Sequence, residues 1–270
     1  MEQRAQLLKK LSFTIFCSEP DQYQPCMPEI QERLAESLRL PQAPVLLEQV
    51  FLFFRVLLLR MPAHHLVSLW PVMVSELVHV LLRLENDLSC DGKSQSQRMV
   101  ISEALLGTNG CYMAYNQEKW LGLYLGACKL LDLAVALPTD ELPYFQMYRW
   151  AFQGDLHAAQ GNTGQSGVFK PHIARLCKLL RKRGKRFDGV QVSEGSSQHS
   201  TGRLFLTMYS IKSIDQLLPF FEYLTRGRTL NGSGTGDEKV PYAKPTKISN
   251  TRALIERVVE RDFLEPLIAD

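Results

Sequence analysis

The sequence has 270 residues, 45% of them hydrophobic, with 31 Lys and Arg against 28 Asp and Glu. A chain of this length and composition can bury the core of one large domain or two small ones. Its net charge of +3 excludes a molecule that binds nucleic acid through its overall charge, so a basic site must be local.

The cysteines indicate a reducing compartment. None of the six forms a Cys-x-x-Cys pair and several lie in helical patterns, which predicts reduced, half-buried thiols in a cytosolic protein. These residues are Cys17, Cys26, Cys90, Cys111, Cys128 and Cys177.

The amino-terminal segment, residues 1–17, carries charges and predicts an amphipathic helix instead of a signal peptide. Because this pattern begins without a polar lead-in, we expect the chain to be the end piece of a longer protein. The most apolar run is broken by Glu48, Arg55 and Arg60, so we expect no membrane span and only peripheral membrane contact.

Apolar residues at helical spacing predict a first helix through Leu7, Leu8, Leu11, Ile15 and Phe16. Residues 18–27 form a connector with two prolines, and residues 28–40 predict a second, amphipathic helix.

The next segment is the most apolar of the chain. Between Pro44 and Pro62 almost every residue is apolar. The exceptions are Glu48, Gln49, Arg55 and Arg60. Such a helix is buried by neighbours on several sides. Pro44 suits its first turn, and Pro62 ends it.

A fourth helix is predicted by apolar residues at three- and four-residue steps, namely Leu66, Leu69, Met73, Leu77, Val80, Leu81 and Leu84. Pro71 falls inside this pattern, so we expect the helix to bend there. The two helices resemble a HEAT-type hairpin, which cannot bury its own faces and therefore implies stacked neighbours.

The second half alternates between helices and polar segments. Residues 89–115, 153–167 and 188–202 are predicted loop insertions. Asn116 caps a broad apolar helix that Pro138 ends, residues 143–152 predict a short aromatic helix, and residues 171–183 predict another helix. Residues 203–211 fit either a strand or a short helix.

The last part repeats an earlier pattern. Ser213 and Gln216 form a capping box, and the residues Leu217-Leu218-Pro219-Phe220-Phe221 echo Leu69-Trp70-Pro71-Val72-Met73. We therefore predict an all-α, HEAT/armadillo-like α-solenoid over residues 1–226. A flexible linker at 227–247 and a carboxy-terminal helix within 248–270, which docks back on the solenoid, complete the chain.

The sharpest local signal is a basic run without acidic residues, which consists of Arg175, Lys178, Arg181, Lys182, Arg183, Lys185 and Arg186. An apolar face of Ile173, Leu176, Cys177 and Leu180 lies opposite. One hypothesis is a phosphoinositide or acidic-membrane contact, worth about 1 kcal/mol per basic residue. The alternative is a solvated face with an ordinary basic helix end. No nucleic-acid-binding motif accompanies the run, so nucleic acid is not an expected partner.

Other motifs favour structural interpretations. The glycine-rich residues 232–236 follow no strand and indicate a linker, and the Glu76–His79 pair lacks the second pair of a di-metal bundle. His64 and His65 are too few for a metal site. Leu77 and Leu84 suggest a short zipper, but core packing explains them better. We predict no catalysis, cofactor or metal.

Many stretches resemble the carboxy-terminal region of the Dopey proteins. They include Gln49-Val50-Phe51-Leu52-Phe53-Phe54-Arg55, His65-Leu66-Val67-Ser68-Leu69-Trp70-Pro71, Cys128-Lys129-Leu130-Leu131-Asp132, Gln146-Met147-Tyr148-Arg149-Trp150-Ala151-Phe152 and Asp262-Phe263-Leu264-Glu265.

The resemblance implies part of a very large cytosolic protein, peripheral on Golgi and endosomal membranes, that acts in endosome-to-Golgi traffic. The implied partners are a large Sec7-related helical-repeat scaffold, a lipid-translocating ATPase and membranes with phosphatidylinositol 4-phosphate. No family motif is catalytic. The basic run is our own assignment of a lipid contact, and the resemblance does not point to it.

We therefore expect a non-catalytic scaffold or adaptor module of a membrane-trafficking protein. The alternative within the binding class is a purely protein–protein module that self-associates as a homo-oligomer. The alternative from another class is an enzyme with an unrecognised site.

Overall fold

The computed structural model describes residues 2–39, 42–89, 117–137, 142–153, 169–187, 208–225 and 248–264. Within these ranges every regular element is a helix and no strand occurs, which confirms the predicted all-α class. The elements are α1 (Glu2–Phe16), η1 (Gln24–Cys26), α2 (Met27–Leu38), α3 (Pro44–Arg60), η2 (Ala63–Leu69), α4 (Trp70–Ser89), α6 (Gln117–Ala136), α7 (Pro143–Gln146), α8 (Arg149–Phe152), α9 (His172–Phe187), η5 (Ile214–Leu217), α10 (Leu218–Thr225) and α11 (Ile248–Arg261).

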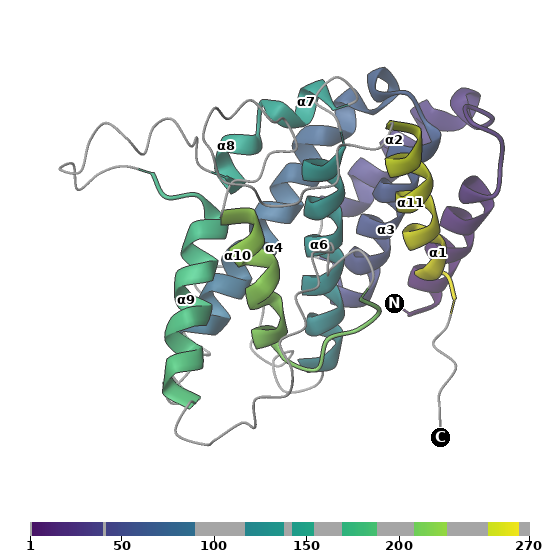
Figure 1. The fold of residues 1–270 in the computed structure, drawn as a ribbon. Helices are drawn as coiled ribbons and strands as arrows, with labels where there is room; N and C mark the ends of the chain where they lie inside the picture. Colours follow the sequence, from purple (N-terminus) through teal and green to yellow (C-terminus); the bar gives the residue numbers. More distant parts are fainter. Residues whose placement is uncertain are drawn as a thin grey trace, which may run out of the picture.

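Helix α3 lies at the centre of the fold, packed along α1 on one side and α6 on the other (Figure 1). Every residue from Val50 to Leu59 is buried, including Arg55. The prediction of a helix covered on several sides is therefore confirmed, with Pro44 in the first turn and Met61 just after the last.

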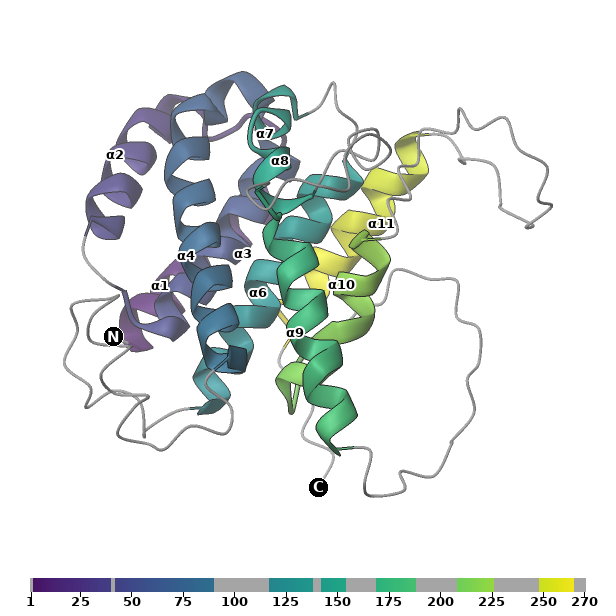
Figure 2. The ribbon, with the colours of Figure 1, turned by 90° about the vertical axis from the view of Figure 1, so that its left-hand side faces the viewer.

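The other helices extend this centre in two directions. Helix α4 contacts both α6 and α9, and α10 packs beside α9, which forms the edge of the fold opposite α1 and α2 (Figures 1 and 2). The principal neighbours of α3 are α1 and α6, and α3 meets α4 through Phe54 and Trp70, whose ring centroids are 5.0 Å apart. The HEAT/armadillo-like stacking of successive hairpins remains a prediction.

Pro71 lies next to a change of helix type instead of inside one continuous α-helix. The fourth helical pattern divides into the 3-10 helix η2 and the α-helix α4, and Pro71 is the second residue of α4. A proline in the first turn loses no intrahelical hydrogen bond, because that N–H has no partner there. The same junction of a 3-10 helix with an α-helix recurs at η5 and α10, where Pro219 is again the second residue of the α-helix. The repeated sequence pattern therefore corresponds to a repeated structural pattern.

Helix α1 buries only part of the predicted face, and Leu8 is half-buried against the core. Ala5, Ser12, Ile15 and Phe16 are buried, whereas Leu7 is 64% exposed. Leu11 and Phe13 are exposed as well. Ser12 fits this buried face because its hydroxyl donates a hydrogen bond to the carbonyl oxygen of Leu8, at 2.8 Å.

Several smaller predictions can be compared with the structure. The aromatic helix at 143–152 forms two short helices, α7 and α8, with a turn between them. The capping box of Ser213 and Gln216 is present, but it opens the 3-10 helix η5. The carboxy-terminal helix α11 packs on α3. The predicted insertions, the Asn116 cap, the ambiguous stretch 203–207 and the glycine-rich 232–236 lie outside the described residues.

The helical stretch Ala63–Ser89 is long and apolar enough to cross a membrane by length and composition, although we expected no such segment. A core helix meets the same two criteria. In this structure Leu66, Trp70, Met73, Leu77 and other apolar residues of the stretch are buried in the shared core, which also agrees with core packing of the zipper-like leucines.

Candidate interaction surfaces

The basic run lies on α9, whose apolar face is buried as the sequence predicts. Ile173, Leu176, Cys177 and Leu180 are between 0 and 3% exposed and pack toward α4 and α10. The basic side chains therefore occupy the rest of the helix surface. For Lys185 and Arg186 the structure describes the helical backbone alone.

Three of the seven basic residues already have acidic partners on neighbouring elements. Arg175 Nε lies 3.4 Å from Glu85 Oε1 on α4, and Arg183 Nε lies 3.4 Å from Asp215 Oδ1 on η5. Arg181 donates to Glu222 Oε1 on α10 at 2.7 Å. These arginines help to hold α9 between α4 and α10, so they are structural as well as basic.

Arg175 belongs to a partly buried cluster. Glu85 Oε1 lies 2.8 Å from Nδ1 of His172, and the Arg175 guanidinium approaches the same histidine nitrogen at 2.8 Å. Arg175, a member of the predicted basic run, therefore turns toward α4.

Lys178 and Lys182 are the basic residues of α9 that face solvent without a recorded ion-pair partner in the described part of the chain. They are four positions apart and therefore share one face of the helix. Among the described side chains of the basic run, these two lysines are left without an ion pair, and the paired Arg181 remains 54% exposed.

A second charged site lies where α11 meets the central helices. The Asp262 carboxylate, just after α11, accepts hydrogen bonds from Arg55 of α3 and Lys129 of α6. The side chains of both cations are almost fully buried, at 3% and 6% exposed. Asp262 thus joins three elements, and it neutralises charge that would otherwise be buried unpaired.

The pKa values in this cluster follow from burial and charge. Burial lowers the pKa of Lys129, against the opposing effect of Asp262. Burial would raise the pKa of Asp262, but Arg55 and Lys129 hold it below its ordinary value. Glu48, next to the cluster on α3, has a pKa that burial raises.

Sequence reasoning missed Asp262 and Lys129 as functional candidates. Arg55 gave a signal, because a cation in a wholly apolar helix requires a buried acidic partner. The sequence does not reveal which carboxylate supplies it, since Asp262 lies 207 positions away.

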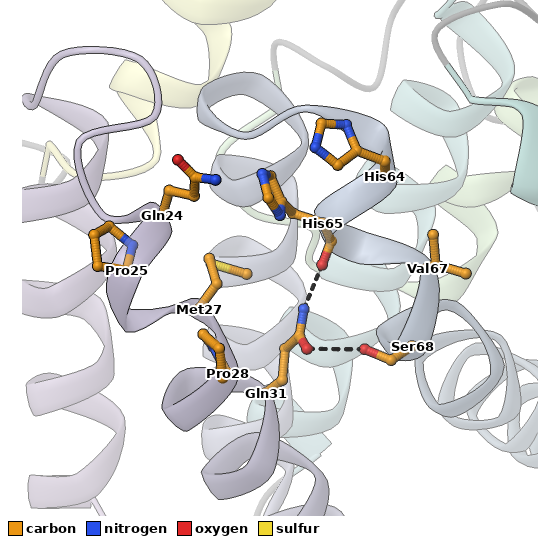
Figure 3. A pocket seen from close by; sticks show the side chains of 9 residues that line it. All are labelled: Gln24, Pro25, Met27, Pro28, Gln31, His64, His65, Val67 and Ser68. Carbon is orange, nitrogen blue, oxygen red and sulfur yellow. Dashed lines mark hydrogen bonds between the residues drawn. The ribbon is translucent and has the colours of Figure 1, made fainter.

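The histidine pair lines a hollow between the start of α2 and η2, with a volume of about 690 Å³ (Figure 3). Gln31 crosses its floor, donating to the carbonyl oxygen of His65 and accepting from Ser68 Oγ at 3.0 Å. The lining residues are Gln24, Pro25, Met27, Pro28, Gln31, His64, His65, Val67 and Ser68. These groups tie two segments together and do not converge on a common point.

Other polar pairs have local explanations. His79 Nδ1 lies 3.6 Å from Glu76 Oε1 across one helical turn, and the histidine is exposed. Within the described ranges no three His, Cys, Asp or Glu side chains cluster as metal ligands would. Among the described cysteines, Cys17, Cys26, Cys128 and Cys177 are free thiols.

Comparison with known proteins places this chain in a family. Residues 1–226 match the family model described as DOP1 C-terminal. The chain is 38% identical to Protein DOP1B of Xenopus laevis and 36% identical to the Protein DOP1 homolog of Drosophila melanogaster, each over 98% of its length. It is 38% identical to Protein pad-1 of Caenorhabditis elegans over 82% of its length.

The chain therefore belongs to the DOP1 C-terminal family, which confirms the resemblance to the Dopey proteins. It spans 12%, 11% and 8% of the length of these three relatives, so it corresponds to a small part of each. No solved structure matches the chain.

Proposed function

We propose that this chain is a non-catalytic interaction module of a Dopey-type scaffold that is cytoplasmic and peripheral on Golgi and endosomal membranes. In this proposal its helical faces bind partner proteins, and α9 contacts phosphoinositide-bearing membrane. The protein partners are the large Sec7-related helical-repeat scaffold and the lipid-translocating ATPase that the family resemblance implies. Membership of the DOP1 C-terminal family supports the proposal at the level of the protein class.

The lipid contact rests on one observation. Lys178 and Lys182 project from a helix whose opposite face is buried, and the described residues supply no carboxylate to either. Each lysine near an anionic surface contributes about 1 kcal/mol. Two lysines give a weak, salt-sensitive contact that helps to position a scaffold held by other attachments.

A second candidate function, a protein–protein module without lipid contact, is favoured by the ion pairs of α9. Because Arg175, Arg181 and Arg183 are bound to Glu85, Glu222 and Asp215, most of the basic run has a structural explanation. In this alternative, the two exposed lysines are simply a solvated face.

Liposome flotation separates the two functions. The intact chain is mixed with vesicles that contain phosphatidylinositol 4-phosphate or with neutral vesicles, at low and at physiological salt. The variant Lys178→Glu/Lys182→Glu reverses both exposed lysines, and Arg4→Glu/Lys10→Glu makes the same charge change on the exposed side of α1.

The lipid proposal expects binding that requires the phosphoinositide, is weakened but not abolished at physiological salt, and is lost in the α9 variant alone. Equal binding by both variants would contradict it and leave the protein–protein function. Loss of binding in both variants would show that overall charge, and not α9, attracts the chain.

A further inference from the structure

Two large aromatic side chains project from the surface where α8 meets the start of α9. Trp150 on α8 is 58% exposed, and Phe169, three residues before α9, is 51% exposed. Their rings pack edge to face, with centroids 5.2 Å apart. Exposed apolar side chains that gather in one place, unlike scattered ones, mark a contact surface. We term this pair the aromatic tip.

The aromatic tip stands on a firmly packed base. Phe145 and Phe152, on either side of Trp150 in the sequence, are 1% and 0% exposed, and their rings stack with centroids 6.0 Å apart. Gln153, just after α8, donates to the carbonyl oxygen of Leu224 on α10 at 3.1 Å. The neighbouring aromatic residues are therefore used for packing, whereas Trp150 and Phe169 are held out toward solvent.

The two described segments that form this surface are free of acidic residues. Residues 142–153 and 169–187 contain no Asp or Glu, and the exposed Lys170 follows directly after Phe169. Among the described side chains of α9, the exposed ones share one stripe of the helix, and they are Ala174, Lys178, Arg181 and Lys182. Lys178 lies only about 9 Å along the helix from its first residue. Apolar rings and unpaired lysines thus occur close together.

Helices α8 and α9 contact each other, and both lie on the side of the molecule that faces the viewer in Figure 2. One flat surface can therefore touch the aromatic tip and the exposed stripe of α9 together. A protein partner would have to supply a shaped pocket for each projecting ring. A bilayer with anionic headgroups needs no such pocket, because its interface accepts aromatic rings and attracts lysines at the same time.

We propose that the aromatic tip inserts into the interface of an anionic bilayer while Lys178 and Lys182 contact the headgroups. This inference rests on the proposed membrane function and adds an apolar part to that contact. Burial of the rings does not depend on ionic strength, whereas the attraction of the lysines is screened by salt. The tip therefore maintains the contact at physiological salt.

Tryptophan fluorescence tests the insertion directly. The intact chain is mixed with vesicles of phosphatidylcholine and phosphatidylinositol 4-phosphate, with or without bromine atoms on the acyl chains, which quench a tryptophan that inserts beside them. Of the three tryptophans, Trp70 is buried and Trp120 is half-buried beneath the Arg83 guanidinium, 3.6 Å away. We therefore expect quenching of Trp150. The variant Trp150→Phe keeps an apolar ring, so it should still bind but lose this quenching.

Vesicle binding measures what the rings contribute. The variant Trp150→Ala/Phe169→Ala should need at least about tenfold more lipid for half-maximal binding at physiological salt, because neither ring is then buried. The control Leu7→Ala/Leu254→Ala removes two side chains of α1 and α11 that are 64% and 53% exposed, and it should bind like the unmodified chain. Thermal unfolding of both variants should match that of the unmodified chain, since all four side chains are exposed.

The results distinguish a failure of the tip from a failure of the membrane function. Equal binding by Trp150→Ala/Phe169→Ala and the unmodified chain, or no quenching of Trp150, would overturn the insertion. If Lys178→Glu/Lys182→Glu still loses binding in that case, the lysine contact stands and the aromatic tip is left as a surface for proteins. An unmodified chain that binds none of these vesicles would overturn both.

Discussion

At the scale of single residues, the contact between α3 and α6 depends on two glycines that face Glu48. A Cβ atom at Gly122 would lie 2.7 Å from Oε2 of Glu48, closer than real contacts allow. A Cβ atom at Gly126 would lie 3.4 Å from Cγ of the same residue, an ordinary distance. Two glycines of one helix are therefore expected to respond differently to the same substitution.

We expect Gly122→Ala to lower the free energy of unfolding by up to about 1 kcal/mol, because the end of the flexible Glu48 side chain must shift within a packed interface. Gly126→Ala should be neutral or stabilising by up to about 1 kcal/mol, because alanine favours the helix. Urea unfolding of both variants measures the difference. Adding Glu48→Ala to Gly122→Ala should remove most of the loss, and a loss that persists would place the strain elsewhere.

Asp262 gives a prediction about pH. Because the pKa of Asp262 is lowered in the folded protein, its contribution to stability is full above the ordinary value of 3.8 and is lost as the pH falls below it. Asp262→Asn should cost about 3 kcal/mol near neutral pH, since it removes the carboxylate that the buried Arg55 and Lys129 both contact.

The difference in unfolding free energy between the unmodified chain and Asp262→Asn should shrink as the pH falls below about 4. Urea unfolding at a series of pH values measures it. The charge of Asp262 contributes to the raised pKa of Glu48, so the same comparison is repeated in a Glu48→Gln background, where the titration of Glu48 is absent. Glu260→Gln is the matched control and should differ little from the unmodified chain at any of these pH values. A difference that does not change with pH would contradict the role given to Asp262.

At the scale of helices, the position of Pro71 decides whether α4 begins next to this proline or runs through it as one bent helix. In the structure it is the second residue of the helix, where it costs no hydrogen bond. Pro71→Ala should then destabilise by less than about 1 kcal/mol, through the greater freedom of the unfolded chain. If Pro71 lay inside a bent helix, the same change would stabilise by up to about 3 kcal/mol.

Thermal or urea unfolding distinguishes these outcomes. Glu76→Pro provides the comparison, because residue 76 lies within the same helix and a proline there should cost about 3 kcal/mol or more. Similar effects of the two changes would contradict the first-turn position of Pro71.

Helix positions were predictable where burial follows a regular spacing, as in α3, where ten successive residues from Val50 to Leu59 are buried. The division between η2 and α4 was not, because 3-10 and α-helices place apolar residues at nearly the same spacing. The partners of α9 were not predictable either. Glu85, Asp215 and Glu222 come from three other elements, and only the tertiary fold brings them to the basic run.

At the scale of the molecule, a series of aromatic contacts links the central helix to the basic helix. The Phe54 ring of α3 meets Trp70 of α4, Trp70 lies 5.6 Å from Phe145 of α7, and Phe145 stacks on Phe152 of α8 at 6.0 Å between centroids. Phe152 in turn lies 6.5 Å from His172 at the start of α9. The two short helices thus join both sides of the fold.

We expect Phe145→Ala to lower the free energy of unfolding by about 3–5 kcal/mol, because it removes a wholly buried ring between α4 and α8. Met147→Ala changes an exposed residue of the next turn and should have an effect within about 0.5 kcal/mol. Urea unfolding followed by tryptophan fluorescence and by circular dichroism should give one coincident transition in both variants, because the ring contacts make the bundle a cooperative unit. Separate transitions in Phe145→Ala would instead show that α9 and α10 unfold independently of the helices around α3.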